Sequence, residues 1–330
     1  MTERTNVHRQ LYRNKDAIID GHVHAGTDAT NVVLQRYPTA QNMMDIVRKM
    51  DASGVDYAAT FPMPSDLFWF DASRLANNLE LVPSLEPAEA FPYQRSNWSH
   101  FHEAKLFGDG KILPFAIILP GVKEEEQINS LRTYINQDSV FGLKFHTFAT
   151  QTHASALKDS KFIRLAQEHS LPITVHSGSD ELSDPQQVIE LAKLYPDVRF
   201  CIAHAADFKK DIFMQLAQNP SHNLFIDTCP HISNCYLAQR EDPNQLLELN
   251  YADPKSALLG LYQQYPQGVI WGTDEPWTTI TDDKNQTILA KVMYEDEASL
   301  LKQLPNDVRK QISYINTVRF LFGDNRPLDV

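Results

Sequence analysis

The hydrophobic positions of this chain fall into short runs separated by longer amphipathic stretches. Each run is rich in β-branched and aromatic residues and has the length of a buried strand. Between the runs, apolar residues recur at the three- and four-residue spacing of helices. This alternation is typical of repeated strand–helix units that build a parallel sheet. Eight runs are predicted as strands, at residues 17–24, 55–63, 112–120, 140–148, 171–178, 198–206, 223–230 and 268–277.

Several of the intervening stretches carry signals for the start or end of a helix. The Asp-Pro pairs at 184–185 and 253–254 each combine a capping side chain with proline at the first helical position. A further periodic segment, residues 308–322, stops at Gly323 in the manner of a helix C-terminus. We therefore predict helices after both Asp-Pro pairs and one long helix near the end of the chain.

Eight strand–helix units in 330 residues favour an α/β fold of the (β/α)8, TIM-type barrel class. No repeat or linker divides the sequence, so we expect residues 1–330 to form a single domain. Two connections, at about 64–111 and 231–251, are longer than a strand–helix loop needs to be. Long loops on a barrel usually cover its substrate-binding end. In the first of them, Trp69 and Phe70 are expected to pack mainly within the loop.

The composition narrows the range of partners. Of the residues, 42% are hydrophobic, which is enough for a large core, and the formal net charge is −12. An acidic chain whose longest basic run is Lys209-Lys210 is a poor binder of nucleic acid. The first residues are too polar for a secretory signal, and no apolar run approaches the roughly 20 residues of a membrane span. We expect a cytoplasmic protein with a small-molecule substrate, and a homo-oligomer stays an open alternative.

The cysteine content does not suggest a disulfide framework. The chain has three cysteines, and no two of them form a CxxC pair. Cys229 and Cys235 could in principle help to bind a metal, but we expect all three to be small buried residues.

Polar residues gather at the ends of the predicted strands, which is where a barrel enzyme carries its chemistry. Asp20, His22 and His24 would share one face of the first strand, because side chains in a strand alternate with a period of two. The intervals from Lys144 to His176 and from there to the next histidine are each about 30 residues, one strand–helix unit. The candidates are His22, His24, Lys144, His146, His176, His204 and Asp274.

Several imidazoles and one carboxylate form a suitable first shell for a divalent transition ion with one position left for water. Such an ion lowers the pKa of a bound water to about 7. Any single histidine of this set is more often a hydrogen-bonded core residue. Their joint occurrence at the strand ends favours a metal site.

The motifs "HVH", "TVHSG", "IAHAA" and "GTDEPW" resemble those of the amidohydrolase superfamily. The resemblance is to its amidohydrolase-related branch, which includes the aminocarboxymuconate-semialdehyde decarboxylase-like enzymes. It implies a distorted (β/α)8 barrel with a metal held by His22, His24, His176 and Asp274, in which Asp274 also accepts a proton from the water. It further implies that His204 is a ligand in two-metal members, or an electrostatic and acid/base group in one-metal members.

The chain also departs from this family pattern. Many relatives continue the sixth strand with glycines after the histidine, whereas this sequence reads "HAAD", and Asp207 is unexpected. In two-metal members the lysine of the fourth strand is carbamylated and bridges the ions. The context "GLKFH" instead resembles one-metal relatives, in which Lys144 stays a cation that could bind a substrate carboxylate. A lysine that merely points into solvent is the third alternative.

The remaining candidates carry less information. His146 and Trp277 are expected to contact substrate, and His231 and Glu275 are weaker pocket candidates. Asp20 either orients a ligating histidine or makes a structural hydrogen bond at the barrel floor.

The sequence therefore predicts a metal-dependent hydrolase that uses metal-activated water to cleave an ester, lactone or amide of a small carboxylate-bearing substrate. We expect one ion per chain, Zn²⁺ first, with Mn²⁺, Fe²⁺ or a two-metal site as alternatives. One rival function is a nonoxidative metal-dependent decarboxylase of an unsaturated or aromatic acid. Another is a degenerate barrel that binds a ligand without turnover.

Overall fold

The computed structural model describes residues 3–28, 31, 37–38, 40–64, 91–282 and 286–324. Its main sheet has the strand order β2-β1-β3-β4-β5-β6-β7-β8-β9, and all neighbours pair in parallel except β2 with β1. The eight parallel strands correspond to the eight predicted ones. They are β1 (Ile19–Thr27), β3 (Tyr57–Pro62), β4 (Ile112–Ile118), β5 (Gly142–Phe145), β6 (Ile173–Val175), β7 (Phe200–Ile202), β8 (Leu224–Asp227) and β9 (Val269–Ile270), with β2 (Ala40–Gln41) at the edge.

The segment that follows β9 closes the sheet onto β1. The Asp274 N–H donates to the carbonyl of His22 at 2.8 Å, and the His24 N–H donates to the carbonyl of Glu275 at 2.7 Å. These bonds continue a parallel ladder between the last and the first barrel strands, although β9 itself is only two residues long. The predicted (β/α)8 barrel is thereby confirmed in a distorted form.

Two glycines allow the last and the first strands to approach each other. A Cβ atom on Gly21 would lie 2.9 Å from the carbonyl oxygen of Trp271, and one on Gly272 would lie 3.0 Å from the Cβ of His22. The first distance is one that Cβ atoms essentially never show, and the second would force a neighbour to shift, so glycine favours this close approach. The approach brings the residues after β9 against His22.

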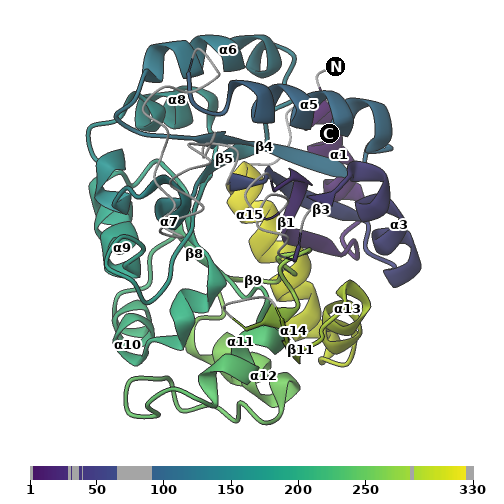
Figure 1. The fold of residues 1–330 in the computed structure, drawn as a ribbon, viewed down its shortest axis with the longest axis vertical. Coiled ribbons are helices and arrows are strands. Elements are labelled where there is room, and N and C mark those ends of the chain that lie inside the picture. The colour runs from purple at the N-terminus through teal and green to yellow at the C-terminus, as the bar shows by residue number, and fades with distance from the viewer. Residues whose placement is uncertain are drawn as a thin grey trace.

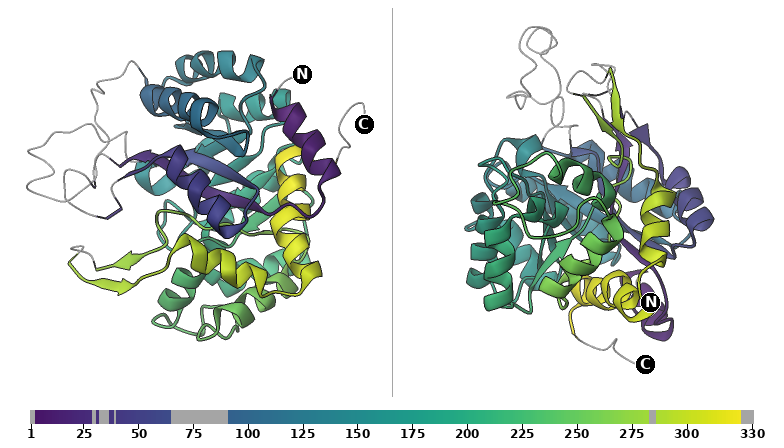
Figure 2. Two further views of the ribbon diagram at one scale, coloured as in Figure 1. Left: turned by 90° about the vertical axis from the view of Figure 1, so that its right-hand side faces the viewer. Right: turned by 90° about the horizontal axis from the view of Figure 1, so that it is seen from below.

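Helices surround the sheet, as Figure 1 shows. The first helix, α1, and the last, α15, lie at one end of the molecule, and the β10–β11 hairpin projects from the opposite end (Figure 2). The hairpin strands are β10 (Ile280–Thr281) and β11 (Ile288–Ala290). The helices and turns are α1 (Glu3–Arg13), α3 (Met43–Ser53), α5 (Gln94–Phe107), α6 (Glu124–Asn136), α7 (Thr147–Thr150), η2 (Ala154–Leu157), α8 (Lys161–His169), α9 (Pro185–Leu194), η3 (His204–Phe208), α10 (Lys210–Gln218), α11 (His231–Ala238), α12 (Pro254–Gln264), α13 (Tyr294–Lys302), α14 (Asn306–Lys310), η4 (Gln311–Ile315) and α15 (Asn316–Phe322).

The helices predicted from the Asp-Pro pairs are α9 and α12, and in both the aspartate side chain accepts a hydrogen bond from the first turn. The long C-terminal helix is instead interrupted by η4, a π-helical turn. At this turn the carbonyl of Ile312 accepts a hydrogen bond from the Trp271 N–H at 3.0 Å. The interruption therefore ties the C-terminal helices to the last barrel strand.

Alternate strand residues belong to two different apolar clusters. On β8, Leu224 and Ile226 pack in the outer cluster between sheet and helices, whereas Phe225 packs in the inner one with Phe115 and Phe320. Because side chains alternate along a strand, the residue after Ile226 returns to the inner face. The apolar inner layer forms the floor on which the polar residues of the strand ends lie.

The two long connections contain regular structure. α5 lies within the first, and α11 opens the second, where the sequence analysis placed loops. Residues 65–90, including Trp69 and Phe70, lie outside the described part of the chain. Among the helices that are described, none is long and apolar enough to cross a membrane.

Candidate metal centre

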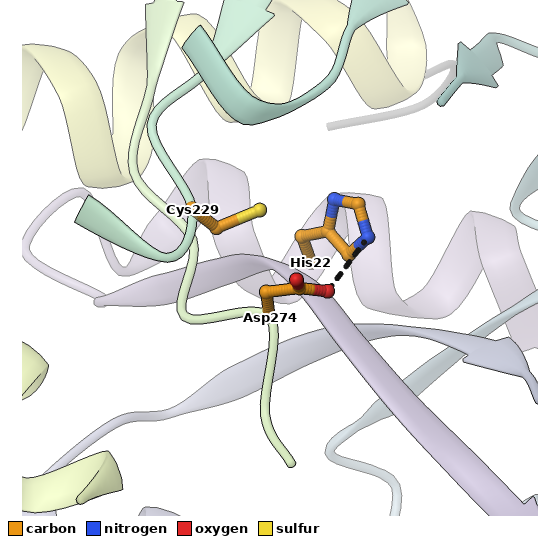
Figure 3. Close-up of side chains that lie close together, drawn as sticks. All are labelled: His22, Cys229 and Asp274. Carbon is orange, nitrogen blue, oxygen red and sulfur yellow. Dashed lines mark ion pairs between the residues drawn. The ribbon is translucent and has the colours of Figure 1, made fainter. Parts of the chain in front are cut away.

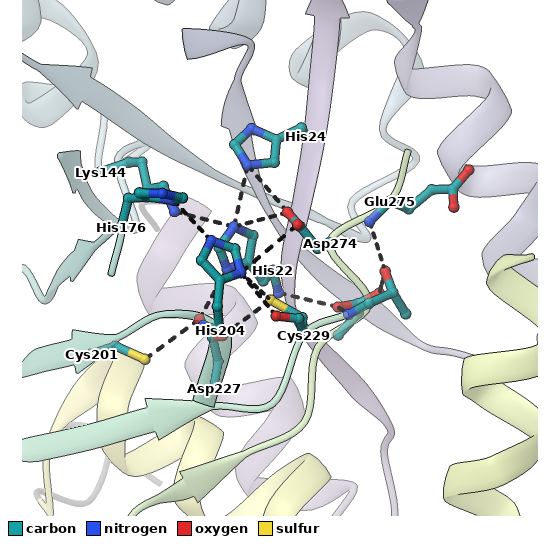
Figure 4. A network of polar contacts seen from close by, with 12 residues as sticks. His22, His24, Lys144, His176, Cys201, His204, Asp227, Cys229, Asp274 and Glu275 are labelled. Atoms are coloured by element: carbon teal, nitrogen blue, oxygen red, sulfur yellow. Dashed lines mark hydrogen bonds and ion pairs between the residues drawn. The ribbon is translucent and has the colours of Figure 1, made fainter. Parts of the chain in front are cut away.

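β1 places two histidines on the inner face of the barrel. His22 and His24 lie within the strand rather than at its end, because β1 continues to Thr27 and pairs there with β2. Their Nε2 atoms are 3.2 Å apart. The period-two alternation predicted from the sequence therefore brings the two rings together, as Figure 4 shows.

The outer nitrogen of each ring is held by the protein. Nδ1–H of His22 donates to the Asp227 carboxylate at 2.9 Å, and Nδ1–H of His24 donates to the carbonyl of Pro62 at 3.2 Å. A neutral imidazole carries one N–H, so these bonds leave both Nε2 atoms as acceptors. Such an outer partner is the usual arrangement for a histidine that ligates a metal.

Asp274 adds a third acceptor at the same point. Its Oδ1 lies 3.4 Å from Nε2 of His22 and 3.5 Å from Nε2 of His24. This oxygen is buried and has no hydrogen-bond donor among the described residues. Nε2 of His22 also lies 3.1 Å from the Lys144 ammonium, whereas Oδ1 of Asp274 has no such donor in the described part of the chain. Two imidazole nitrogens and an unpaired carboxylate oxygen that converge at one point fit a divalent cation.

The electrostatics of the cluster agree with this interpretation. Burial lowers the pKa of His22 and of His24 well below 6.5, so both rings are neutral, which is the form that ligates a metal. Burial also raises the pKa of Asp274 well above that of a free carboxyl. A bound cation would favour the ionised carboxylate.

Three more histidines extend the cluster along the strand ends. The His204 ring lies 5.3 Å from that of His22, and its Nε2 is 2.9 Å from Nδ1 of His176. His146 stacks on His176 with ring centroids 3.9 Å apart. Nδ1–H of His204 donates to the carbonyl of Cys229 at 2.9 Å. The structure thus places His176 beside His204, one ring away from the pair on β1.

Lys144 lies at the base of the cluster. Its side chain is fully buried, its Nζ is 3.1 Å from Nε2 of His22, and the ammonium group sits 4.8 Å from the centre of the Phe61 ring. The alternative of a solvated lysine is therefore wrong. Burial lowers the pKa of Lys144, while the nearby carboxylates of Asp227 and Asp274 oppose that effect.

Two further residues of the cluster are Asp227, which was not a sequence candidate, and Cys229, which was expected to be a small buried residue. Asp227 ends β8 and accepts hydrogen bonds from the His22 ring at 2.9 Å and from the backbone N–H of His204 at 2.8 Å. Cys229 follows two residues later and is fully buried. The available signal was the alternation along β8, which puts Asp227 on the same face as Phe225.

Asp20 supports the site through the backbone. Its Oδ1 accepts from the N–H of His22 at 3.1 Å and from that of Thr273 at 3.0 Å, and its Oδ2 accepts from the Thr273 hydroxyl at 2.8 Å. Burial raises the pKa of Asp20 to about 7. Of the two alternatives for Asp20, the structural hydrogen bond is present, and it joins the first barrel strand to the residue before Asp274.

Glu275 turns away from the cluster and belongs to a separate polar network. It forms an ion pair with Lys49 of α3 and accepts from the Thr278 hydroxyl at 3.1 Å. Lys49 also donates to the side chain of Gln41, whose amide donates to the carbonyl of His24 at 2.9 Å. This network braces the backbone on both sides of the candidate ligands.

The other two sequence candidates have different surroundings. His231 is the first residue of α11. Its Nε2–H donates to the carbonyl of Pro254 at 2.8 Å, so this histidine links α11 to α12. Trp277 is half-buried, and its backbone N–H donates to the carbonyl of Asp274 at 2.7 Å. Its role in substrate binding stays a prediction.

An unusual turn follows the sixth barrel strand. The backbone of residues 204–208 has φ between 50° and 61° at five consecutive positions, none of them glycine. Left-handed backbone costs an ordinary residue roughly 1–2 kcal/mol. The conformation is the one that glycine favours, and here Ala205, Ala206 and Asp207 adopt it.

A barrel with histidines and an aspartate gathered at its strand ends has the architecture of a barrel enzyme. The chain belongs to the amidohydrolase family, whose model matches residues 85–323. This span includes His176, His204 and Asp274 but begins after His22 and His24. No curated protein matches the chain.

Solved structures of similar fold come from several bacteria. A protein described as a 2-pyrone-4,6-dicarboxylic acid hydrolase from Pseudomonas putida has a TM-score of 0.56 at 15% identity, over 93% of this chain and 98% of that one. A 5-carboxyvanillate decarboxylase from Novosphingobium aromaticivorans, complexed with manganese, has a TM-score of 0.55 at 12% identity, over 92% and 96%. A 4-oxalomesaconate hydratase from Rhodopseudomonas palustris has a TM-score of 0.55 at 16% identity, over 92% and 95%.

At these identities the likeness establishes the fold alone. The protein is an enzyme of the amidohydrolase type, and its family is metal-dependent. The similar folds include a hydrolase, a decarboxylase and a hydratase, so the reaction must be argued from the residues of this site.

Proposed function

We propose that the protein is a metal-dependent hydrolase that cleaves an ester, lactone or amide bond in a small carboxylate-bearing substrate. The proposed ligands are His22, His24, His176 and Asp274, with one divalent transition ion per chain. Imidazole and carboxylate donors suit Zn²⁺ and also Mn²⁺ or Fe²⁺. The manganese in a structure of similar fold makes Mn²⁺ an ion to test beside Zn²⁺.

One observation carries the proposal. Nε2 of His22, Nε2 of His24 and Oδ1 of Asp274 converge within 3.5 Å of one another, and no hydrogen-bond donor among the described residues reaches the carboxylate oxygen. When bound there, a divalent ion would lower the pKa of water and polarise a carbonyl.

The residues around this point have separate tasks in the proposed reaction. Asp274 accepts the proton of the attacking water on Oδ2, because Oδ1 is the oxygen that faces the two β1 histidines. Nδ1 of His204 lies 3.8 Å from Asp274 Oδ2, and this ring helps to stabilise negative charge that develops in the reaction. Lys144 stabilises negative charge that develops on the substrate, because its ammonium group is buried where electrostatic interactions are strong.

Nonoxidative decarboxylation is the second candidate. The similarity in fold to a 5-carboxyvanillate decarboxylase favours it, and an ion held by the same residues would orient a substrate carboxylate. The two candidates differ in their products. Hydrolysis consumes water and releases two fragments or opens a ring, whereas decarboxylation releases CO2.

The test is a product analysis with metal-loaded protein. Lactones, esters, amides, and unsaturated or aromatic carboxylic acids are incubated with protein loaded with Zn²⁺ or Mn²⁺. Products are identified by mass, and released CO2 is measured in parallel. We expect hydrolysis of at least one carboxylate-bearing substrate, with no release of CO2.

The control is the His24→Gln variant, which removes one proposed ligand but keeps a polar side chain. It should lose the activity. Release of CO2 in proportion to substrate consumed would overturn the hydrolase proposal in favour of a decarboxylase. Turnover by His24→Gln equal to that of the wild type would show that the activity arises elsewhere.

A further inference from the structure

Cys229 is a buried cysteine that lies beside two of the proposed metal ligands, His22 and Asp274. It follows β8, its side chain is fully buried, and Figure 3 shows its sulfur turned toward His22 and Asp274. One ligand atom from each of the three residues lies within 4.8 Å of the others. The distances between ligand atoms around one zinc ion are typically about 3–4 Å, so a small shift would complete the contact.

A second observation indicates that a cation belongs at this point. Oδ1 of Asp274 is buried, lacks a hydrogen-bond donor among the described residues, and faces Nε2 of His22 and Nε2 of His24. The Lys144 ammonium lies 3.1 Å from Nε2 of His22 but donates no hydrogen bond to this oxygen. A buried carboxylate oxygen surrounded by acceptors needs a positive partner. The thiol of Cys229 is thus next to a position that already calls for a metal ion.

We propose that Cys229 supplies a thiolate ligand to the ion bound by His22 and Asp274. This inference rests on the proposed function, which places the ion there, and adds a sulfur donor to it. In the structure the thiol donates to Asp227 Oδ1 at 3.0 Å. As the sulfur–metal bond forms, the S–H bond breaks and the proton leaves to solvent.

A thiolate ligand has a consequence for the choice of metal. Sulfur is a soft donor that favours Zn²⁺ over Mn²⁺, whereas an imidazole and carboxylate set alone discriminates less between them. With the Cys229 thiolate as a ligand, bound Zn²⁺ would not be displaced by a large excess of Mn²⁺. Cys229 also belongs to a second group of possible ligand atoms, with His204 and Asp227. Its sulfur is therefore shared by the two groups.

The other two cysteines provide matched controls because both are buried and neither belongs to these groups of ligand atoms. Cys201 is on β7, with its sulfur 3.7 Å from the Asp227 carboxylate. Cys235 is on α11, with its sulfur 3.5 Å from Nε2 of His231. In the double variant Cys201→Ser/Cys235→Ser, Cys229 is the only thiol left in the chain.

The experiment is titration of the metal-free, full-length protein with Co²⁺, followed by absorption spectroscopy. Visible ligand-field bands report that the ion is bound, and a near-ultraviolet sulfur-to-cobalt charge-transfer band reports a thiolate ligand. We expect both sets of bands in the wild type and in the Cys201→Ser/Cys235→Ser variant. Cys229→Ser should keep the ligand-field bands and lose the charge-transfer band.

The possible failures can be told apart. Ligand-field bands without a charge-transfer band in the double variant would overturn the thiolate and leave the metal centre standing. Absence of both sets of bands in the wild type would overturn the metal centre as well. If Cys229→Ser does not fold, the double variant alone decides, because any sulfur band in it must come from Cys229.

Discussion

Asp274 is held in place by its backbone, and its carboxylate is left free to act. Its φ is 61°, and its N–H donates to the carbonyl of His22 at 2.8 Å. Aspartate and asparagine tolerate left-handed backbone better than most residues do. Asp274 lies outside any helix or strand, so its left-handed backbone and its hydrogen bond to His22 direct its short side chain toward β1.

We predict that Asp274→Asn loses nearly all turnover and keeps its fold. An amide cannot accept the proton of the attacking water, and loss of a general base typically costs about 10²–10⁴-fold. Asparagine fits the same backbone, so the thermal midpoint should change little. The measurement is kcat on the substrate found by the product screen. A variant that keeps more than half of the wild-type rate would show that another residue is the base.

Lys144 decides between a one-metal and a two-metal site. Its burial lowers its pKa, which increases the neutral amine that carbamylation requires, so the structure keeps the bridging carbamate as a serious rival. The one-metal interpretation rests on the resemblance of "GLKFH" to one-metal relatives. In that case the ammonium group stays beside His22 and acts by its charge.

We predict that Lys144→Met leaves the metal content near one ion per chain and lowers kcat or raises KM. Methionine fills a similar volume, so the core beside Phe61 should not collapse. Metal content and steady-state kinetics are measured on the same preparation. Loss of bound metal in Lys144→Met, together with incorporation of labelled CO2 into the wild type, would instead establish the carbamate and two ions.

At the scale of elements, the left-handed turn η3 sets the position of His204. Ala203, which precedes it, has a φ of −75°, whereas Ala205 and Ala206 both have a φ of 50°. All three alanines are fully buried. They differ mainly in backbone conformation, so substitutions at these three positions compare the free-energy cost of left-handed backbone with that of extended backbone.

We predict that Ala205→Gly and Ala206→Gly destabilise the protein less than Ala203→Gly does. Each change removes a buried methyl, worth about 0.8 kcal/mol, and adds flexibility to the unfolded chain. At positions 205 and 206, relief of roughly 1–2 kcal/mol of left-handed strain offsets that loss. Urea unfolding of the metal-free variants gives the three free energies. Equal losses at all three positions would mean that the turn is not strained.

The elements that could be predicted from the sequence are those marked by a local pattern of apolar residues or by a capping motif. The eight barrel strands were visible as buried runs, and α9 and α12 were visible from the Asp-Pro pairs. The C-terminal helix was predicted as continuous because apolar periodicity does not reveal a π turn. The turn exists because the Ile312 carbonyl meets the Trp271 N–H, a contact from another part of the chain.

The same limit applies to the site. His22, His24 and Asp274 could be proposed together because strand ends meet in a barrel. Asp227 was passed over because its partner, the outer nitrogen of His22, is 205 residues away in sequence. The hydrogen bonds of Asp20 and the ion pair between Lys49 and Glu275 likewise join distant segments, so they appear only in the folded chain.

At the scale of the whole molecule, closure of the barrel assembles the centre. The β1 histidines and Asp274 come from opposite ends of the sequence and meet where the segment after β9 pairs with β1. The family match covers only the later part of this assembly, residues 85–323. The hydrogen bonds between the first and last strands therefore join His22 and His24 to the rest of the site.

Elemental analysis of protein purified without chelator tests the central claim, a metal held by this closure, most directly. We predict about one equivalent of a transition metal in the wild type, and a loss of most of it in His24→Gln. His231→Gln serves as the control, because it alters a buried histidine outside the cluster and should keep the metal. Less than about a tenth of an equivalent in the wild type, not restored by added Zn²⁺, Mn²⁺ or Fe²⁺, would contradict the account.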